Sequence, residues 1–177
     1  MNSHIQYVLS GRLLMPFCLL ICLLTTLISG YAQEKPPRPI EVKIKSVNTL
    51  QGLNFGIIAP SSSDGFVTIP PSFPGPRAWS NVVLLAGGTY SPALFEVLAI
   101  PGTLITIELP TSVFLSNSPT GSLEITELVS STGSPFITTG DITSVYIGGK
   151  LNVKTISFQP PGNYGGSIVV KFTQIQQ

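Results

Sequence analysis

The sequence predicts an all-β fold, and three features of its pattern carry this prediction. Short stretches in which apolar and polar residues alternate recur at intervals of about ten residues. Valine, isoleucine and threonine are abundant in these stretches, and their branched side chains favour the pleated sheet. No stretch carries apolar residues at helical spacing over three turns. Together these features predict about nine short strands in an antiparallel β-sandwich, with a barrel as the alternative.

The first 32 residues are predicted to be a signal peptide. A polar start with one positive charge, Arg12, precedes an uncharged apolar run that ends in small residues suited to a signal peptidase. Pro16 interrupts the run, which is shorter than the roughly 20 residues that span a bilayer. This disfavours a retained membrane anchor. We expect cleavage between Ala32 and Gln33, a proline-rich lead-in over 33–39 and one β-sandwich domain over 40–177.

The first strands are expected directly after the lead-in. The stretch "IEVKIKSV" places Ile40, Val42 and Ile44 on one face and charged residues on the other, as in a half-buried strand. Two further strands are expected in "LNFGIIAP", closed by Pro60, and in "FVTIPP", with a polar turn at Asp64–Gly65 between them. A proline-rich loop, "SFPGPR", then leads into a strand in "WSNVVLLAGG".

The second half of the chain continues the same alternation. Strands are expected in "LFEVLAI", "TLITIELP", "SLEITELV", "SPFITTG", "TSVYIGGKLNVKTISF" and the closing "SIVVKF". Their alternating pattern assigns one set of side chains to the interior: Phe95, Val97, Ile105, Ile107, Leu109, Ile168, Val170 and Phe172. We expect this set to form much of the core.

Loss of the leader removes every cysteine and histidine, because Cys18, Cys22 and His4 all precede the cleavage point. Disulfides, cysteine nucleophiles, Ser-His pairs and thiolate or imidazole zinc sites are thereby excluded. Eight basic and eight acidic residues remain without a basic stripe, which argues against a nucleic-acid partner. The sequence carries no known hydrolase, phosphate-loop or calcium-loop motif. We therefore predict no enzymatic activity, no cofactor and no catalytic or metal-binding residue.

The acidic residues that come closest to a functional pattern have better structural explanations. Glu124 and Glu127 stand three apart in a predicted strand, so we expect them on opposite faces, unsuited to act as the paired carboxylates of a glycosidase. Asp64 and Asp141 each stand alone beside a glycine, whereas calcium needs six to eight oxygens. Both aspartates are expected in turns.

Aromatic residues suggest an alternative function, the binding of a carbohydrate or another ligand. Trp79 lies beside the proline-rich loop and could form a stacking platform with Tyr90, Tyr146 or Tyr164. Arg77 in the same loop could bind a carboxylate. Aromatic residues in a sandwich more often pack in the core or at sheet edges, so a structural role is the first expectation.

The order of several stretches resembles a known family. From about Leu53 to Phe172 the chain follows the pattern of the bacterial secreted β-domains grouped as domain of unknown function 4402: "LNFGIIAP", "GFVTIPPS", "LLAGGTYSPALFEV", "PGTLITIELP", "VYIGGKLNV" and "GNYGGSIVVKF". The L-x-F-G start and the G-x-Y-x-G run also resemble spore coat protein U and other pilin-like adhesin domains. This resemblance implies an immunoglobulin-like sandwich and a structural or adhesin-like role in a surface fibre or layer. The early cysteine of the pilin pattern is absent here.

The resemblance also raises the question of what lies beside the last strand. In pilin-like domains a neighbour's N-terminal extension fills the place of a missing strand, and "PIEVKIKSV" is the candidate donor here. The favoured alternative is that this stretch pairs in cis with the last strand, because a bare sheet edge invites aggregation. The expected location is periplasmic, cell-surface or extracellular, without a stable membrane span. The expected partners are other surface proteins or copies of the chain, joined through edge strands.

Overall fold

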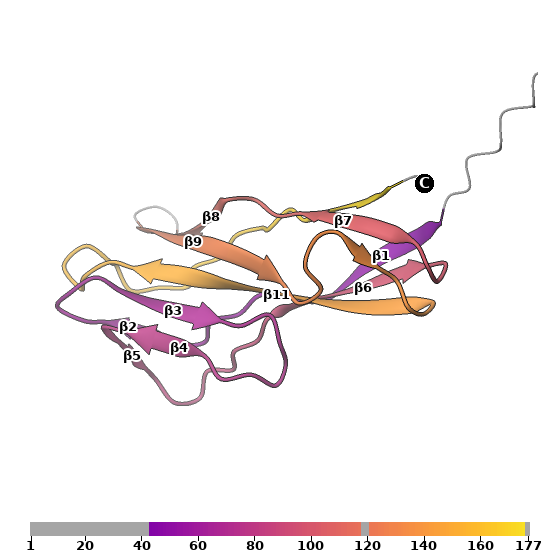
Figure 1. Ribbon diagram of the computed structural model, residues 1–177. Helices are drawn as coiled ribbons and strands as arrows, with labels where there is room; N and C mark the ends of the chain where they lie inside the picture. The colour runs from indigo at the N-terminus through magenta and orange to yellow at the C-terminus, as the bar shows by residue number, and fades with distance from the viewer. Residues whose placement is uncertain (1–42, 118–120, 176–177) are drawn as a thin grey trace, which may run out of the picture. The chain divides into compact units, whose positions relative to one another are not determined.

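The computed structural model describes residues 43–117 and 121–175, which belong to one compact unit. This part of the chain forms twelve strands and no helix (Figure 1), and every strand pairing is antiparallel. The prediction of an all-β, antiparallel fold is confirmed. In the described ranges no helix is long and apolar enough to cross a membrane. The predicted leader and the proline-rich lead-in lie outside these ranges.

The largest sheet has seven strands and is organised around β11 (Ile142–Val153). The first half of β11 pairs with β6 (Ala93–Ala99). Its second half pairs with β3 (Gly65–Ile69) and with β9 (Gly121–Ser130). The long valine- and isoleucine-rich β11 therefore holds the two halves of the domain together.

Three further strands extend this sheet outward. β1 (Ile44–Gln51) pairs with β6, β4 (Ala78–Ser80) with β3, and β8 (Ser112–Asn117) with β9. β1 is thus paired in cis, as we favoured for the stretch "PIEVKIKSV", of which residues 39–42 lie outside the described ranges. Its partner is β6 and not the last strand, so the predicted pairing of the first and last strands is wrong.

Two small sheets complete the fold. One has the order β10-β7-β12, where β10 is Phe136–Ile137, β7 is Leu104–Glu108 and β12 is Lys171–Gln174. The other pairs β2 (Ile58–Pro60) with β5 (Val82–Leu84). No ladder joins β12 to β2 in the described residues.

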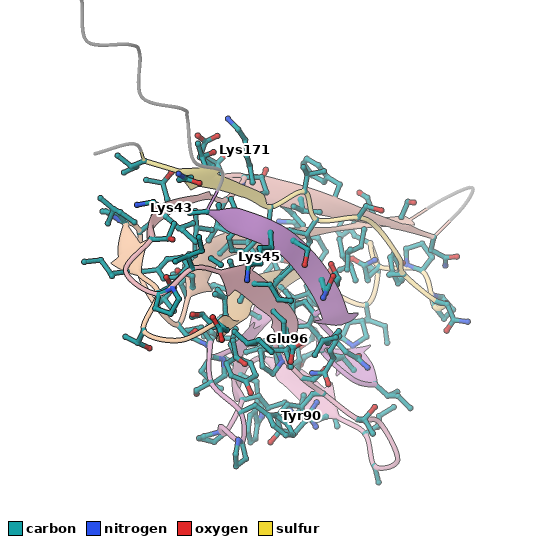
Figure 2. The ribbon with its side chains drawn as sticks, turned by 90° about the vertical axis from the view of Figure 1, so that its right-hand side faces the viewer. Lys43, Lys45, Tyr90, Glu96 and Lys171 are labelled. Carbon is teal, nitrogen blue, oxygen red and sulfur yellow. The ribbon has the colours of Figure 1, made fainter. Side chains whose placement is uncertain are left out.

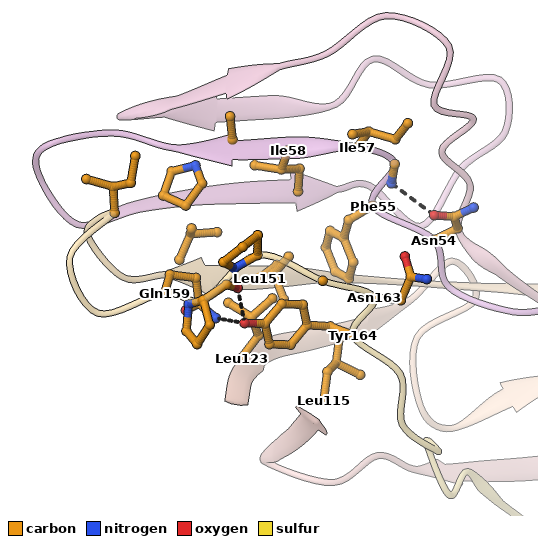
Figure 3. A pocket seen from close by; sticks show the side chains of 18 of the residues that line it. Asn54, Phe55, Ile57, Ile58, Leu115, Leu123, Leu151, Gln159, Asn163 and Tyr164 are labelled. Atoms are coloured by element: carbon orange, nitrogen blue, oxygen red, sulfur yellow. Dashed lines mark hydrogen bonds between the residues drawn. The ribbon is translucent and has the colours of Figure 1, made fainter. Parts of the chain in front are cut away.

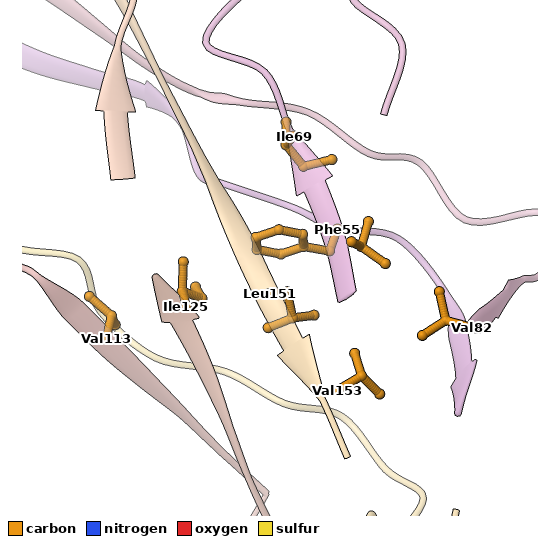
Figure 4. Packing of buried hydrophobic residues seen from close by; sticks show 8 residues of the cluster. Phe55, Ile69, Val82, Val113, Ile125, Leu151 and Val153 are labelled. Atoms are coloured by element: carbon orange, nitrogen blue, oxygen red, sulfur yellow. The ribbon is translucent and has the colours of Figure 1, made fainter. Parts of the chain in front are cut away.

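Two apolar clusters form the core between the large sheet and the small ones. The first packs β6 and β11 against β7 and β10, and its members include Val97, Ile105 and Val145, each with no exposed surface. The second packs β3, β9 and β11 against β5 and Phe55 (Figure 4). Burying each such side chain contributes roughly 1.5–3 kcal/mol. The interior set expected from alternation is confirmed, with Phe95, Leu109, Ile168, Val170 and Phe172 only partly buried.

Two predicted strands are interrupted by left-handed backbone. The stretch "LNFGIIAP" is a ladder strand only from Ile58, because Gly56 has a φ of 84° and Asn54 makes only a single bridge to Ser91. The stretch "WSNVV" is divided by Asn81, whose φ is 52°. Asparagine tolerates this conformation better than most residues. The turn at Asn81 sends β4 and β5 into different sheets.

Candidate functional site

A cleft of about 680 Å³ lies between the β2 region and the segment that follows β11 (Figure 3). Its floor is the inward face of the seven-stranded sheet, with Leu115 from β8, Leu123 from β9, and Leu151 and Val153 from β11. One wall is the run 53–60 and the other is the run 159–164. The cleft therefore reaches the second core cluster from outside.

The cleft exists because the layer facing the large sheet is incomplete at this end. Among the described residues, β2 pairs with β5 on one edge and with no strand on the other, and the chain before β12 contacts β8 through a bridge between Ser116 and Gly165. Pro160 and Pro161 have no backbone N–H to donate, so this wall cannot continue a ladder toward β2. The cleft therefore lies between β2 and the run 159–164, which are not joined by a ladder in the described residues.

Tyr164 fixes the second wall. Its hydroxyl donates a hydrogen bond to the carbonyl oxygen of Pro160 at 2.5 Å and accepts one from Nε2 of Gln159 at 2.6 Å. Gln159 is only 7% exposed, so its amide depends on this partner. The ring of Tyr164 packs against Gly121, where a Cβ atom would overlap the hydroxyl. The wall is thus held by its own side chains.

The lining of the cleft carries no charge. Of the nineteen residues around it none is acidic, basic or histidine, and the polar ones are Asn54, Gln159, Asn163 and Tyr164. Asn54 uses its side-chain oxygen to accept the backbone N–H of Gly56 at 2.9 Å. The lining provides no acid–base pair. It suits an uncharged, largely apolar occupant.

Asp64 links the turn before β3 to the segment that directly follows β11. Its carboxylate accepts a hydrogen bond from Nζ of Lys154 at 2.8 Å and one from the backbone N–H of Thr155 at 3.1 Å. The Lys154 hydrogen bond lowers the pKa of Asp64 below its usual 3.8, and Asp64 in turn raises the pKa of Lys154. The expectation that Asp64 is a turn residue agrees with this geometry. No group of three or more potential metal ligands occurs among residues 43–117 and 121–175.

Glu124 and Glu127 do not point to opposite faces, and that prediction is wrong. Glu127 has a φ of 51°, and the register between β9 and β11 shifts beside it. This bulge places Glu127 on the outer face, where its carboxylate pairs with Nζ of Lys150 at 2.8 Å. Glu124 also lies outward, since its neighbours Leu123 and Ile125 pack in the core. The two glutamates belong to the outer surface and to no cleft.

Trp79 and the three tyrosines do not come together. The one aromatic ring pair within the described residues is Phe95 with Phe172. Trp79 is 53% exposed on the edge strand β4, and Tyr164 belongs to the cleft. Arg77 makes contacts within the fold, because Nη1 of its guanidinium donates to the carbonyl of Phe55 at 2.9 Å and the guanidinium lies over the ring of Tyr90, 4.5 Å from its centroid.

Tyr90 instead lines a second, shallower cleft of about 570 Å³ beside the proline-rich loop. Phe73, which is 57% exposed, lies on the other side of it. The remaining lining residues are Gly52, Leu53 and four with hydroxyl or amide side chains: Gln51, Asn54, Thr89 and Ser91. This combination of aromatic and uncharged polar groups was not apparent from the sequence, because its members come from three separate segments.

The side chain of Gln174 on β12 contacts the start of β1. Oε1 of Gln174 accepts hydrogen bonds from the backbone N–H groups of Lys43 at 2.8 Å and Ile44 at 3.4 Å. Figure 2 faces this side of the molecule, with Lys43 directly before β1, Lys45 on β1 and Lys171 on β12. Both strands are edges of their sheets. The side chain of Gln174 bridges them without a ladder.

The main cleft was not predicted from the sequence. Its two walls are about a hundred residues apart in the chain, and neither carries a motif. The only local signal is the run "QPPGNYGG", in which two prolines and three glycines oppose ladder formation just before an alternating strand.

Comparison with known proteins identifies one family. The model of a family described as Domain of unknown function (DUF4402) matches residues 45–173. No curated protein matches the chain, and no solved structure matches it either.

Proposed function

The chain belongs to the DUF4402 family, and we propose that it is an exported, non-enzymatic protein of the cell surface, adhesin-like or part of a fibre or surface layer. Its partners are other surface proteins or further copies of the chain. It works by pairing strand edges rather than by chemistry at a side chain. The alternating faces beside those edges supply apolar contacts that give specificity.

The observation that carries this proposal is the number of strand edges without a neighbour. Within the described residues β1, β4, β8, β10 and β12 are edge strands, β5 has one open edge, and β2 has one beside the main cleft. An unpaired edge presents a row of N–H and C=O groups that can accept another strand. Two further observations support the proposal. The main cleft is uncharged, and residues 33–177 contain no histidine or cysteine, which strand pairing does not require.

We further propose that the packed sheets form an immunoglobulin-like sandwich of the pilin type. Two features support this. All pairings are antiparallel, and the chain passes from the three-stranded sheet at β7 directly to the seven-stranded sheet at β8. Strands that change sheets in this way are common in Greek-key sandwiches. An experimental structure of residues 33–177, compared with pilin domains, tests the assignment.

Export is tested by N-terminal sequencing of the protein from the periplasmic and surface fractions. We expect Gln33 as the first residue, and the protein should be digested by protease added to intact cells or be released in a high-molecular-weight form. A full-length chain with its leader, recovered from the cytoplasm as a monomer, contradicts the proposal. Deleting residues 33–42 leaves β1 intact and tests whether the lead-in contributes to assembly.

The alternative is an extracellular module that binds a carbohydrate or another small ligand. The second cleft favours it, because Phe73 and Tyr90 flank hydroxyl and amide groups of the kind that recognise sugars. A glycan array tests it, with Phe73→Ala as the variant that should lose the signal and Trp79→Ala as the matched exposed control. An array without any Phe73-dependent signal argues against this alternative.

A further inference from the structure

We infer that the main cleft binds an extended, uncharged peptide segment of another protein, which adds a strand to the open edge of β2. The inference rests on the proposed function and deepens it by naming the pairing site and the chemistry of the partner. The segment carries apolar side chains at alternate positions, which enter the cleft and pack on Leu115, Leu123 and Leu151.

The backbone of β2 gives the first reason. The N–H of Leu85 donates to the carbonyl of Ile57 at 3.0 Å, and the register pairs Ile58 with Leu84 and Ala59 with Val83. Hydrogen-bonded and non-hydrogen-bonded pairs alternate along an antiparallel ladder. The N–H and C=O groups of Ile58 therefore point away from β5, toward the cleft edge of β2. A peptide backbone can pair with both groups, whereas an acyl chain pairs with neither.

The charges around the other edges give the second reason. Lys45 lies on β1 and Lys171 on β12, and lysines on edge strands oppose the addition of another strand. The nineteen residues around the main cleft include no charged group. The edge strands β4, β8 and β10 also carry no charged residue, but among the described edges the β2 edge is the one whose own run, 53–60, forms a wall of the uncharged main cleft.

The same criterion decides against the chain's own N-terminal segment as the occupant. Residues 44–51 are already paired with β6. The run before them, "QEKPPRPIEV", carries four charged residues and three prolines in ten positions. Prolines cannot donate to a ladder and the charges do not suit an uncharged cleft. The occupant therefore comes from a different sequence, with alternating apolar residues and without charges.

A peptide-binding titration tests the inference on the mature chain, residues 33–177. The probe is a fluorescein-labelled octapeptide with capped ends in which valine and threonine alternate, and binding is followed by fluorescence anisotropy. The first control has the same composition with the four valines together, which removes the alternation. The second control carries N-methyl groups on every second residue, which removes the N–H groups along one edge. We expect saturable binding of the alternating peptide and at least tenfold weaker binding of both controls.

Protein variants locate the binding site. Leu123→Glu places a charge on the cleft floor and should weaken binding at least tenfold, whereas Val129→Glu, on the same strand but 47% exposed, should leave it unchanged. If Leu123→Glu does not fold by circular dichroism, Asn163→Glu at the exposed rim takes its place.

Three results would overturn the inference. The first is that the N-methylated peptide binds as tightly as the alternating peptide. The second is that dodecanoate displaces the probe while the alternating peptide and its controls bind equally. The third is that no peptide shows saturable binding. None of these affects export or surface assembly, so the proposed function is judged separately by fractionation.

Discussion

The substitution Gly148→Ala tests a close approach of two strands, β3 and β11. Gly148 lies in β11 between Ile147, the last residue paired with β6, and Gly149, the first paired with β3. A Cβ atom at this position would overlap the carbonyl oxygen of Ile69 and lie 2.7 Å from backbone atoms of Pro70 and Pro71. All of these are main-chain atoms, so no side-chain rotation can relieve the overlap. The end of β3 would have to move.

The expected cost follows from these contacts. Overpacking in a tightly packed interior costs about 1–3 kcal/mol, and moving the end of β3 also disturbs Ile69, which is 1% exposed in the core. Replacing glycine with alanine also lowers the conformational entropy of the unfolded chain, which raises the free energy of unfolding by about 0.4–1 kcal/mol. Because main-chain atoms form the overlap, we take the upper end of the overpacking range, about 3 kcal/mol, and expect a net loss of about 2 kcal/mol in the free energy of unfolding. This is a large part of the 5–15 kcal/mol typical of a domain, but it leaves the protein folded.

Urea denaturation of residues 33–177, followed by far-UV circular dichroism and by the fluorescence of the single tryptophan, Trp79, measures this loss. With a slope of about 2 kcal/mol per molar urea, the midpoint should fall by about 1 M. The matched control is Gly52→Ala, because a Cβ atom there meets nothing within 4 Å and the backbone is not left-handed. Its midpoint should stay unchanged or rise. An unchanged midpoint for Gly148→Ala, or equal losses in both variants, would refute the close approach of β3 and β11.

Two other substitutions test interactions around the main cleft. Tyr164→Phe removes the hydroxyl that bonds Gln159 and Pro160 and leaves a buried amide without its partner, so the free energy of unfolding should fall by about 1–2 kcal/mol; stability equal to wild type in the same urea titration would speak against that hydrogen-bonded wall. For Asp64, an NMR titration of the carboxyl group should give a pKa below 3.8 that returns toward 3.8 in Lys154→Gln. Because the pKa is lowered in the folded state, this contact stabilises the fold above pH 3.8 and the contribution is lost as the pH falls through the folded-state pKa. An identical titration curve in Lys154→Gln would show that the ion pair does not form in solution.

Local alternation was sufficient to predict most strands and their buried faces. Val97 and Ile105 stand at inward positions of their stretches and are fully buried, whereas Glu108 points outward and pairs with Lys171. This works because the side chains of a strand alternate between two faces with a period of two, a property that depends only on neighbours in the chain. The prediction for Glu124 and Glu127 failed at the bulge, where one extra residue in β9 breaks that period.

By itself, the sequence determined the class of the molecule: an antiparallel, all-β chain of the DUF4402 family whose residues 33–177 lack histidine and cysteine. The tertiary structure decided which edges meet, namely that β1 lies beside β6, that Asn81 sends β4 and β5 into different sheets, and that a cleft remains between β2 and Tyr164. The reason is physical. Strand partners are joined by backbone groups common to every residue, so the choice among them depends on packing across the whole core and not on any local pattern.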